Sequence, residues 1–160
     1  MNSRRKDWVI PTKAGQMSRI VGVVYPVPIN LVGRLFTSRR NVFVKYLPRT
    51  TSINLRPGDK VLFYASHASK QVIGEGIIKD IEFLTPDEAL SKHGDKLLLN
   101  KEELANYTAR QPMRTSAKKM LALTIDKATE YATPIRYPRP LTMAGEYITK
   151  EKYESLMKKV

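Results

Sequence analysis

The order of short elements between residues 34 and 79 constrains the fold of this chain more than any other feature. A helical stretch leads into a basic segment with an aromatic residue, and a Pro-Gly-Asp turn (57–59) follows. The next apolar stretch ends at 64–66, and a small polar loop separates it from a stretch that contains Gly-Glu-Gly (74–76). Pro presets φ and Gly accepts positive φ, so these turns separate strands. Short strands in this order predict a small β-barrel with helices over its openings.

Hydrophobic patterning predicts the remaining elements. We expect strands at 20–27, 41–47, 60–65, 72–83 and 119–126, and short helices at 30–36, 85–94, 100–107 and 149–160. Capping boxes that begin at Thr85 and Asn100 mark two of the helix starts. Residues 131–140 carry three prolines and predict an irregular or edge-like segment. Residues 142–147 predict a loop that enters the last helix, and the alternative is that this loop flanks the cleft. Together these elements predict an α+β fold, a mixed barrel of five or six strands with short flanking helices.

Length and composition favour a single domain. A chain of 160 residues with 42% hydrophobic content can bury one core. Residues 1–17 predict a basic N-terminal arm, and 18–160 predict the domain itself. No apolar run approaches the ~20 residues of a membrane helix, and no secretory h-region follows the basic N-terminus. The chain has no cysteine, which excludes disulfides and thiolate chemistry, and we expect a cytoplasmic protein.

The positive charge is concentrated in one part of the chain. Residues 1–60 hold twelve Lys or Arg and two acidic residues, a net charge of +10 out of +13 for the whole chain. A polarised field of this sign favours a polyanionic partner. No stretch reads as a basic amphipathic helix, so nucleic acid is favoured over anionic lipid.

The segment after the first predicted helix resembles a known motif. The ASCH pattern of the PUA-like superfamily is Gly-x-Lys-x-x-Glu-x-Arg, and residues 38–45 (SRRNVFVK) fall on its spacing. Arg40 stands for the Lys, Phe43 for the Glu and Lys45 for the Arg, so the two basic positions keep a cation and the acid is absent. The segments 57–64 and 73–76 also resemble strands of this superfamily, of its ASCH and EVE branches in particular.

The resemblance covers residues from about 20 to 160 and extends to an uncharacterised archaeal group. It implies a PUA-like β-pseudobarrel whose cleft binds RNA, single strands or modified bases. Related ASCH amidohydrolases use a Lys, a Thr and a Glu. Glu75 stands where that Glu lies, but Phe43 occupies the position of the nucleophile, so the acyl-transfer mechanism lacks its attacking group.

Residues two apart on a strand share a face, so Phe43 and Lys45 project together. An aromatic ring beside an ammonium is a common solution for binding single strands, and stacking on such a ring contributes ~1–3 kcal/mol per base. The alternative is that Phe43 belongs to the core and that Lys45 extends to an edge. We expect phosphate contacts and base contacts from two sets of residues. The first set is Arg34, Arg39, Arg40 and Lys45, and the second is Phe43, Tyr64, Ser66, His67, Lys70 and Glu75.

Three functions remain open from the sequence. The first is non-catalytic binding of RNA or another single-stranded nucleic acid, with recognition of a base or a modified base. The second is an ASCH-like hydrolase acting on acylated cytidine or RNA, with Glu75, Lys45 and Arg40 as its catalytic residues. The third is a protein-interaction module. His67 and His93 are the only histidines and neither has a second ligand at metal spacing, so we expect no metal, no cofactor and no membrane partner.

Overall fold

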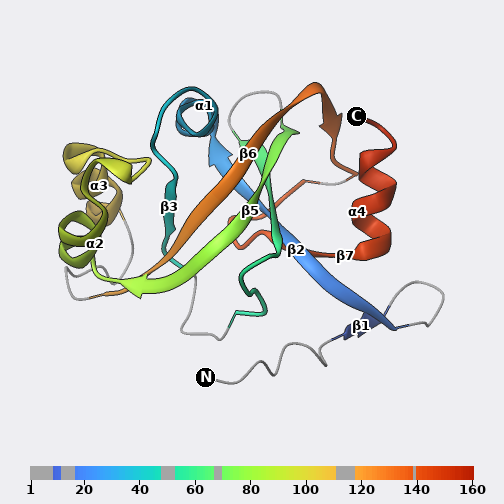
Figure 1. Ribbon diagram of the computed structural model, residues 1–160, viewed down its shortest axis with the longest axis horizontal. Coiled ribbons are helices and arrows are strands. Elements are labelled where there is room, and N and C mark those ends of the chain that lie inside the picture. Colours follow the sequence, from blue (N-terminus) through green and yellow to red (C-terminus); the bar gives the residue numbers. More distant parts are fainter. Residues whose placement is uncertain (1–8, 12–16, 48–52, 67–69, 111–117, 139) are drawn as a thin grey trace.

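The computed structural model describes residues 9–11, 17–47, 53–66, 70–110, 118–138 and 140–160. Over these residues, seven strands form one mixed sheet in the order β1-β2-β4-β5-β6-β3, and β7 pairs with β2 beside β1 (Figure 1). The strands are β1 (Val9–Pro11), β2 (Met17–Pro28), β3 (Val42–Lys45), β4 (Lys60–Ser66), β5 (Gln71–Leu84), β6 (Met120–Arg136) and β7 (Glu146–Thr149). The sheet is not closed, because β3 lies at one end and β1 and β7 at the other. The predicted α+β class with a PUA-like pseudobarrel is confirmed.

Most neighbouring strands are antiparallel, with one exception that matters for the site. β2 and β4 run parallel, from Gly22 opposite Lys60 to Pro28 opposite Ser66. Their carboxyl ends therefore meet at one edge of the sheet, and the chain enters α1 (Ile29–Thr37) from that edge. The same edge supplies one side of the pocket described below.

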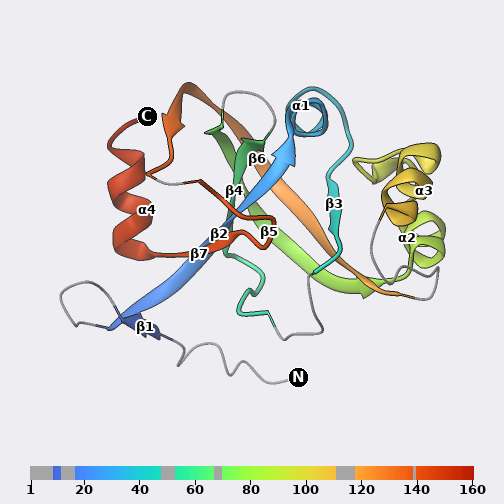
Figure 2. The ribbon, with the colours of Figure 1, turned by 180° about the vertical axis from the view of Figure 1, so that it is seen from behind.

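The predicted capping boxes are present at two helices. Thr85 begins α2 (Pro86–His93) and Asn100 begins α3 (Lys101–Ala109), and each cap accepts from the backbone N–H three residues later. Thr149 caps α4 (Lys150–Met157) in the same way without the reciprocal acidic residue. A 3-10 turn at Gly94–Lys96 separates α2 from α3. Figures 1 and 2 show α2 and α3 at one end of the sheet and α4 at the other.

Alternation along the strands sorts the core into three clusters. Val23, Val27, Val61 and Phe63 pack with Val32 and Leu35 of α1. The intervening Val24, Leu62 and Tyr64 pack with Leu156 of α4 on the opposite face. The even residues of β3, Val42 and Val44, pack with Leu97 and Leu104 beside α2 and α3. The long strand β6 contributes to all three clusters, so one sheet connects the whole molecule.

Two segments differ in part from the sequence interpretation. Residues 131–136, predicted as irregular or edge-like, are not irregular but continue β6. Their edge toward β3 is unpaired, because β3 pairs only with Leu121 to Thr124. Pro134 thus lies where one edge of β6 is unpaired, and it falls in a register shift against β5. The segment predicted as a helix-entry loop contains β7, a strand of four residues that is too short for alternation to reveal. Among the described residues, no helix is long and apolar enough to cross a membrane.

Candidate functional site

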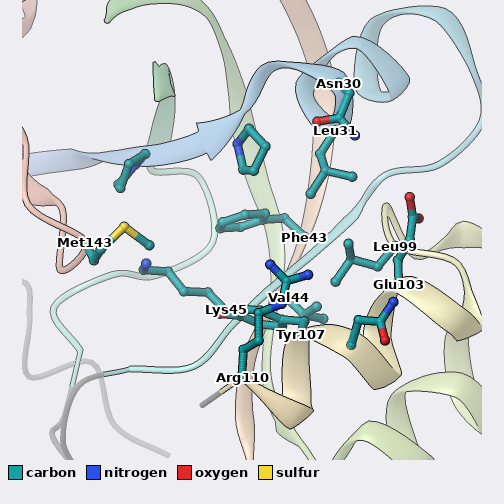
Figure 3. A pocket seen from close by; sticks show the side chains of 13 residues that line it. Asn30, Leu31, Phe43, Val44, Lys45, Leu99, Glu103, Tyr107, Arg110 and Met143 are labelled. Carbon is teal, nitrogen blue, oxygen red and sulfur yellow. The ribbon is translucent and has the colours of Figure 1, made fainter. Parts of the chain in front are cut away.

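A pocket of about 390 Å³ opens between α1, β3 and α3, and we call it the α1–α3 pocket (Figure 3). Its walls are mainly apolar, with a few polar side chains among them. The lining residues are Pro26, Pro28, Asn30, Leu31, Phe43, Val44, Lys45, Leu99, Glu103, Asn106, Tyr107, Arg110 and Met143. Apolar walls with few convergent polar groups are typical of sites for small organic ligands and bases.

The turn before β7 forms the rim of the pocket opposite α3. The backbone N–H of Gly145 donates to the carbonyl of Thr142 at 3.0 Å, and Gly145 has φ +76°, which favours glycine. A Cβ at this position would lie 2.5 Å from the ring of Tyr25, so the turn packs directly on that ring. This contact holds Met143, whose side chain is 63% exposed, at the edge of the pocket.

Lys45 brings a charge into this pocket from the last position of β3. The residue is only 4% exposed, and its Nζ atom lies 5.3 Å from the centre of the Tyr25 ring. Burial lowers the pKa of Lys45 to about 8. Within the described residues, no carboxylate forms an ion pair with this ammonium. Burial also raises the pKa of Tyr25, so the phenol beside the amine stays neutral and supplies no counter-charge.

Phe43 lies on the same face of β3, as the strand period predicts. Its ring is 6% exposed, belongs to the core cluster under α1 and also lines the pocket. The ring centre lies 5.9 Å from that of Tyr25 at a 39° tilt. Figure 3 shows the Phe43 ring between Leu31 and the Arg110 guanidinium, at the middle of the pocket. Phe43 is therefore both a core residue and an aromatic surface toward the pocket.

The wall opposite α1 is one face of α3. Glu103, Asn106, Tyr107 and Arg110 follow the i, i+3, i+4, i+7 spacing of a single helix face. The hydroxyl oxygen of Tyr107 accepts from the backbone N–H of Tyr46 at 2.9 Å, which ties the helix to β3. Arg110, the C-terminal cap of α3, is exposed, and its guanidinium points into the pocket in Figure 3.

Arg34 and Arg40, predicted as phosphate contacts, form hydrogen bonds to α3 and to the segment that precedes it. Arg34 donates to both carboxylate oxygens of Glu103 at 2.6 and 2.8 Å and to the carbonyl of Leu98 at 2.6 Å. This guanidinium, with the N–H of Asn100, lowers the pKa of Glu103 to about 2. Arg40 donates to the carbonyl of Leu97 at 2.8 Å.

The remaining predicted site residues that the structure describes do not line this pocket. Tyr64 is buried on the α4 face, edge-on to Tyr137 at 6.2 Å. Ser66 is half-buried at the end of β4, opposite Pro28. Arg39 and Lys70 are exposed, and Lys70 has φ +57°. His67 lies outside the described residues.

Glu75 belongs to a separate polar cluster beneath α4. Its side chain is 15% exposed, and its carboxylate accepts from Lys60 Nζ at 3.0 Å, from the Tyr131 hydroxyl at 2.7 Å and from the Tyr153 hydroxyl at 2.9 Å. Lys60 Nζ also lies 5.2 Å from the centre of the Tyr153 ring. The cluster joins β4, β5 and β6 to α4, and Glu75 faces a different environment from Lys45.

The glycines on either side of Glu75 allow neighbouring side chains to pack directly against the backbone of β5. A Cβ at Gly74 would lie 2.5 Å from the ring of Phe36, and one at Gly76 would lie 2.3 Å from Ile125 Cγ2. The close approach expected from the Gly-Glu-Gly sequence is therefore present. It serves the packing of α1 and β6 against β5.

Sequence reasoning missed most of the pocket lining. It placed Phe43 and Lys45 together and gave residues 142–147 as a loop that flanks the cleft or only enters the last helix, but it did not anticipate Asn30 or the α3 face. The spacing of Glu103, Asn106 and Arg110 was a signal that could have identified the α3 face. Nothing local in the sequence could have shown that this face lies opposite α1.

The arrangement can bind a flat group that carries negative charge or hydrogen-bond acceptors. The ring of Phe43 and the surrounding aliphatic walls suit the flat group, and Lys45 and Arg110 supply donors and positive charge. Asn30 and Asn106 can each donate and accept. Over the part of the chain that the structure describes, no three His, Asp or Glu side chains are grouped as metal ligands.

Solved structures support the fold. The structure is similar to the ASCH protein of Zymomonas mobilis, with a TM-score of 0.65, 15% identity, and coverage of 86% of this chain and 94% of that one. A single-substitution variant of the same protein gives a TM-score of 0.70 at 14% identity, covering 86% and 97% of the two chains. The N-terminal domain of Staphylothermus marinus McrB gives 0.56 at 13% identity, covering 87% and 93%. At these identities the likeness shows a common PUA-like, ASCH-type fold.

Sequence comparison provides the family. An uncharacterised protein of Methanocaldococcus jannaschii, MJECS03, is 25% identical over 107 residues, which are 63% of this chain and 99% of that protein. The family model described as "Domain of unknown function (DUF365)" matches residues 20–150. This match runs from within β2 through β7 and thus covers most of the chain. The chain therefore belongs to the DUF365 family, with a PUA-like fold of the ASCH type.

Proposed function

We propose that this protein binds RNA or another single-stranded nucleic acid without catalysis, and that one nucleotide enters the α1–α3 pocket. One observation carries the proposal. A buried ammonium without an acidic partner among the described residues shares a pocket with an aromatic ring. A buried unpaired charge costs free energy unless a ligand supplies acceptors or negative charge. A nucleotide provides a flat base for Phe43 as well as acceptors for the cations.

The residues divide into three roles. Phe43 and Lys45 contact the inserted nucleotide, and Arg110 contacts a phosphate at the mouth of the pocket. The exposed Arg39 contacts a phosphate further along the strand, as the sequence suggests, and the exposed Lys70, expected near a base, is assigned to a phosphate as well. Arg34 and Arg40 act indirectly, because their hydrogen bonds position the α3 wall.

The test is a titration of a labelled single strand at several salt concentrations. Phosphate contacts release counterions, so we expect the affinity to fall steeply with salt. Arg110→Gln should weaken binding of all sequences about equally and lower the salt slope by about one. Lys79→Gln is the matched control, since Lys79 is exposed on β5 and does not line the pocket. An affinity that does not vary with salt would contradict the proposal.

A hydrolase is the second candidate, and the pKa of Lys45 favours it. An amine with a pKa of about 8 can exchange protons near neutral pH, which suits a general acid or base. The expected catalytic group of Glu75, Lys45 and Arg40 is not assembled, however, because the lining of the pocket contains Lys45 alone of the three. We expect no turnover of acetylated cytidine or RNA. Turnover that is lost in Glu75→Gln would instead support the enzyme.

A further inference from the structure

The two cations of the α1–α3 pocket lie at different depths. Lys45 is 4% exposed and lies on β3 against Tyr25, whereas Arg110 is exposed at the end of α3. A phosphate in a continuous strand remains at the surface, because the chain must enter and leave the site. A base that stacks on Phe43 enters the pocket with its hydrogen-bonding edge leading. The buried ammonium therefore meets a base edge, and the exposed guanidinium meets the backbone.

The chemistry of an ammonium restricts which base edge it accepts. Lys45 offers three donors and no acceptor. Uracil and guanine present a carbonyl oxygen at the position where cytosine and adenine present an amino group. A carbonyl oxygen accepts from the ammonium, whereas an amino group places donor against donor, so the buried charge has no acceptor at that position of the base.

The other polar groups of the pocket impose no opposite preference. The side chains of Asn30 and Asn106 each carry a donor and an acceptor, and so they can adapt to either type of base. The carboxylate of Glu103, the acidic group of the lining, is held by Arg34 and by the N–H of Asn100. These donors take three of its roughly four acceptor sites, so it attracts an amino group less than an unpaired carboxylate would.

We propose that Lys45 is a specificity determinant that makes the pocket prefer keto bases, uracil and guanine, over the amino bases cytosine and adenine. This inference rests on the proposed function, because it requires that a base enters the pocket. It assigns Lys45 to the base, in contrast to the phosphate contact expected from the sequence.

The first experiment uses the unaltered protein. Fluorescence anisotropy compares labelled oligouridylate with oligocytidylate of equal length, which differ at the carbonyl or amino group of each base. A second pair of strands differs only by inosine or adenosine at one central position. We expect the keto member of each pair to bind about tenfold more tightly, the range that an unmatched buried polar group produces.

Variants then separate base recognition from phosphate contact. Lys45→Met keeps the length of the side chain and removes the charge, so it should abolish the keto preference and leave the salt slope unchanged. Arg110→Gln should keep the preference and lower the slope. Lys79→Met is the control for the loss of an exposed lysine and should alter neither the preference nor, by more than a small amount, the affinity.

The outcomes distinguish this inference from the function on which it rests. Binding without a keto preference in the unaltered protein overturns the inference and leaves the proposed function standing. A Lys45→Met variant that keeps the preference but loses salt dependence shows that Lys45 contacts phosphate, and also overturns it. Absence of salt-dependent binding to any strand overturns both proposals.

Discussion

Lys45 occupies a position whose surroundings favour an apolar side chain. Its β3 neighbours are core residues, and its ammonium lies against the ring of Tyr25. Burial lowers the pKa of Lys45 from 10.5 to about 8. Between these values the unfolded chain binds more protons than the folded one, so stability increases as pH rises through this window. The charge therefore opposes folding at neutral pH, as is common for residues at binding sites.

Replacing Lys45 should stabilise the protein at neutral pH. Each unit of pKa shift corresponds to about 1.4 kcal/mol, so Lys45→Met should raise the free energy of unfolding by up to about 3 kcal/mol. The difference between the variant and the unaltered protein should shrink as pH rises from about 8 to 10.5. Urea unfolding at a series of pH values measures it, with Lys79→Met as the control. A variant less stable than the unaltered protein at neutral pH would contradict the interpretation that the Lys45 ammonium is buried without an ion-pair partner.

Glu75, unlike Lys45, is a charged residue that should stabilise the fold, because both of its carboxylate oxygens accept hydrogen bonds. Glu75→Gln removes the charge opposite Lys60 and places an amide against two tyrosine hydroxyls. We expect a loss of about 1–3 kcal/mol in the free energy of unfolding. The affinity for single strands should not change, since Glu75 does not line the pocket. Denaturation measures the change in stability and anisotropy measures the affinity, both on the same preparation. Weaker binding by a fully folded variant would show that Glu75 contributes to the binding site.

At the scale of elements, the ion pair between Arg34 and Glu103 links α1 to α3, and Arg34 itself does not line the pocket. The capping box of α3 uses the same carboxylate, since Glu103 also accepts from the N–H of Asn100. The side chain of Glu103 thus takes part in the cap of α3 and also fixes the position of α3 relative to α1. The pocket depends on this contact because α1 and α3 form two of its walls.

Loss of this link should destabilise the protein in a pH-dependent manner. The pKa of Glu103 is lowered to about 2, so its contribution is present above the ordinary carboxyl value and is lost as pH falls from about 4.5 to 2. Both side chains are about one-third exposed, and solvent screening limits the effect of Glu103→Gln to about 1 kcal/mol at neutral pH. Thermal unfolding of the variant and the unaltered protein should converge toward pH 2. A difference that persists there would show that packing, and not the ion pair, is responsible.

The elements that could be predicted from the sequence are those with local signals. The capping residues Thr85 and Asn100 specify helix starts within a few residues, and the strand period places Phe43 and Lys45 on one face. Contacts between distant residues have no such signal. The bond from Arg34 to Glu103 joins residues 69 apart in sequence, and that from Tyr153 to Glu75 joins residues 78 apart. The sequence therefore indicated two residues of the pocket and, as one of two alternatives, the loop at its rim, while tertiary packing decides which other residues surround them.

At the scale of the whole molecule, net charge does not identify the cations that are available to a ligand. Among the cations of residues 1–60 that the structure describes, Arg34, Arg40 and Lys60 are engaged with protein acceptors, and Lys45 is buried. The field of a chain with net charge +13 still attracts any polyanion. Two components of binding are thus expected, a general attraction and a contribution from the pocket.

Charges remote from the pocket should affect only the general component. Lys158 and Lys159 are exposed at the end of α4, at the opposite end of the molecule from α3 (Figure 1). Replacing both with Gln removes two positive charges out of a net +13. We expect slower association and a modestly lower affinity at low salt for uridine and cytidine strands alike, since steering fades as the Debye length shortens to ~8 Å at physiological ionic strength. Stopped-flow association at several salt concentrations, with Arg110→Gln in parallel, separates the components. If the α4 variant changed the relative affinity for the two strands, the ligand would also contact the α4 end of the molecule.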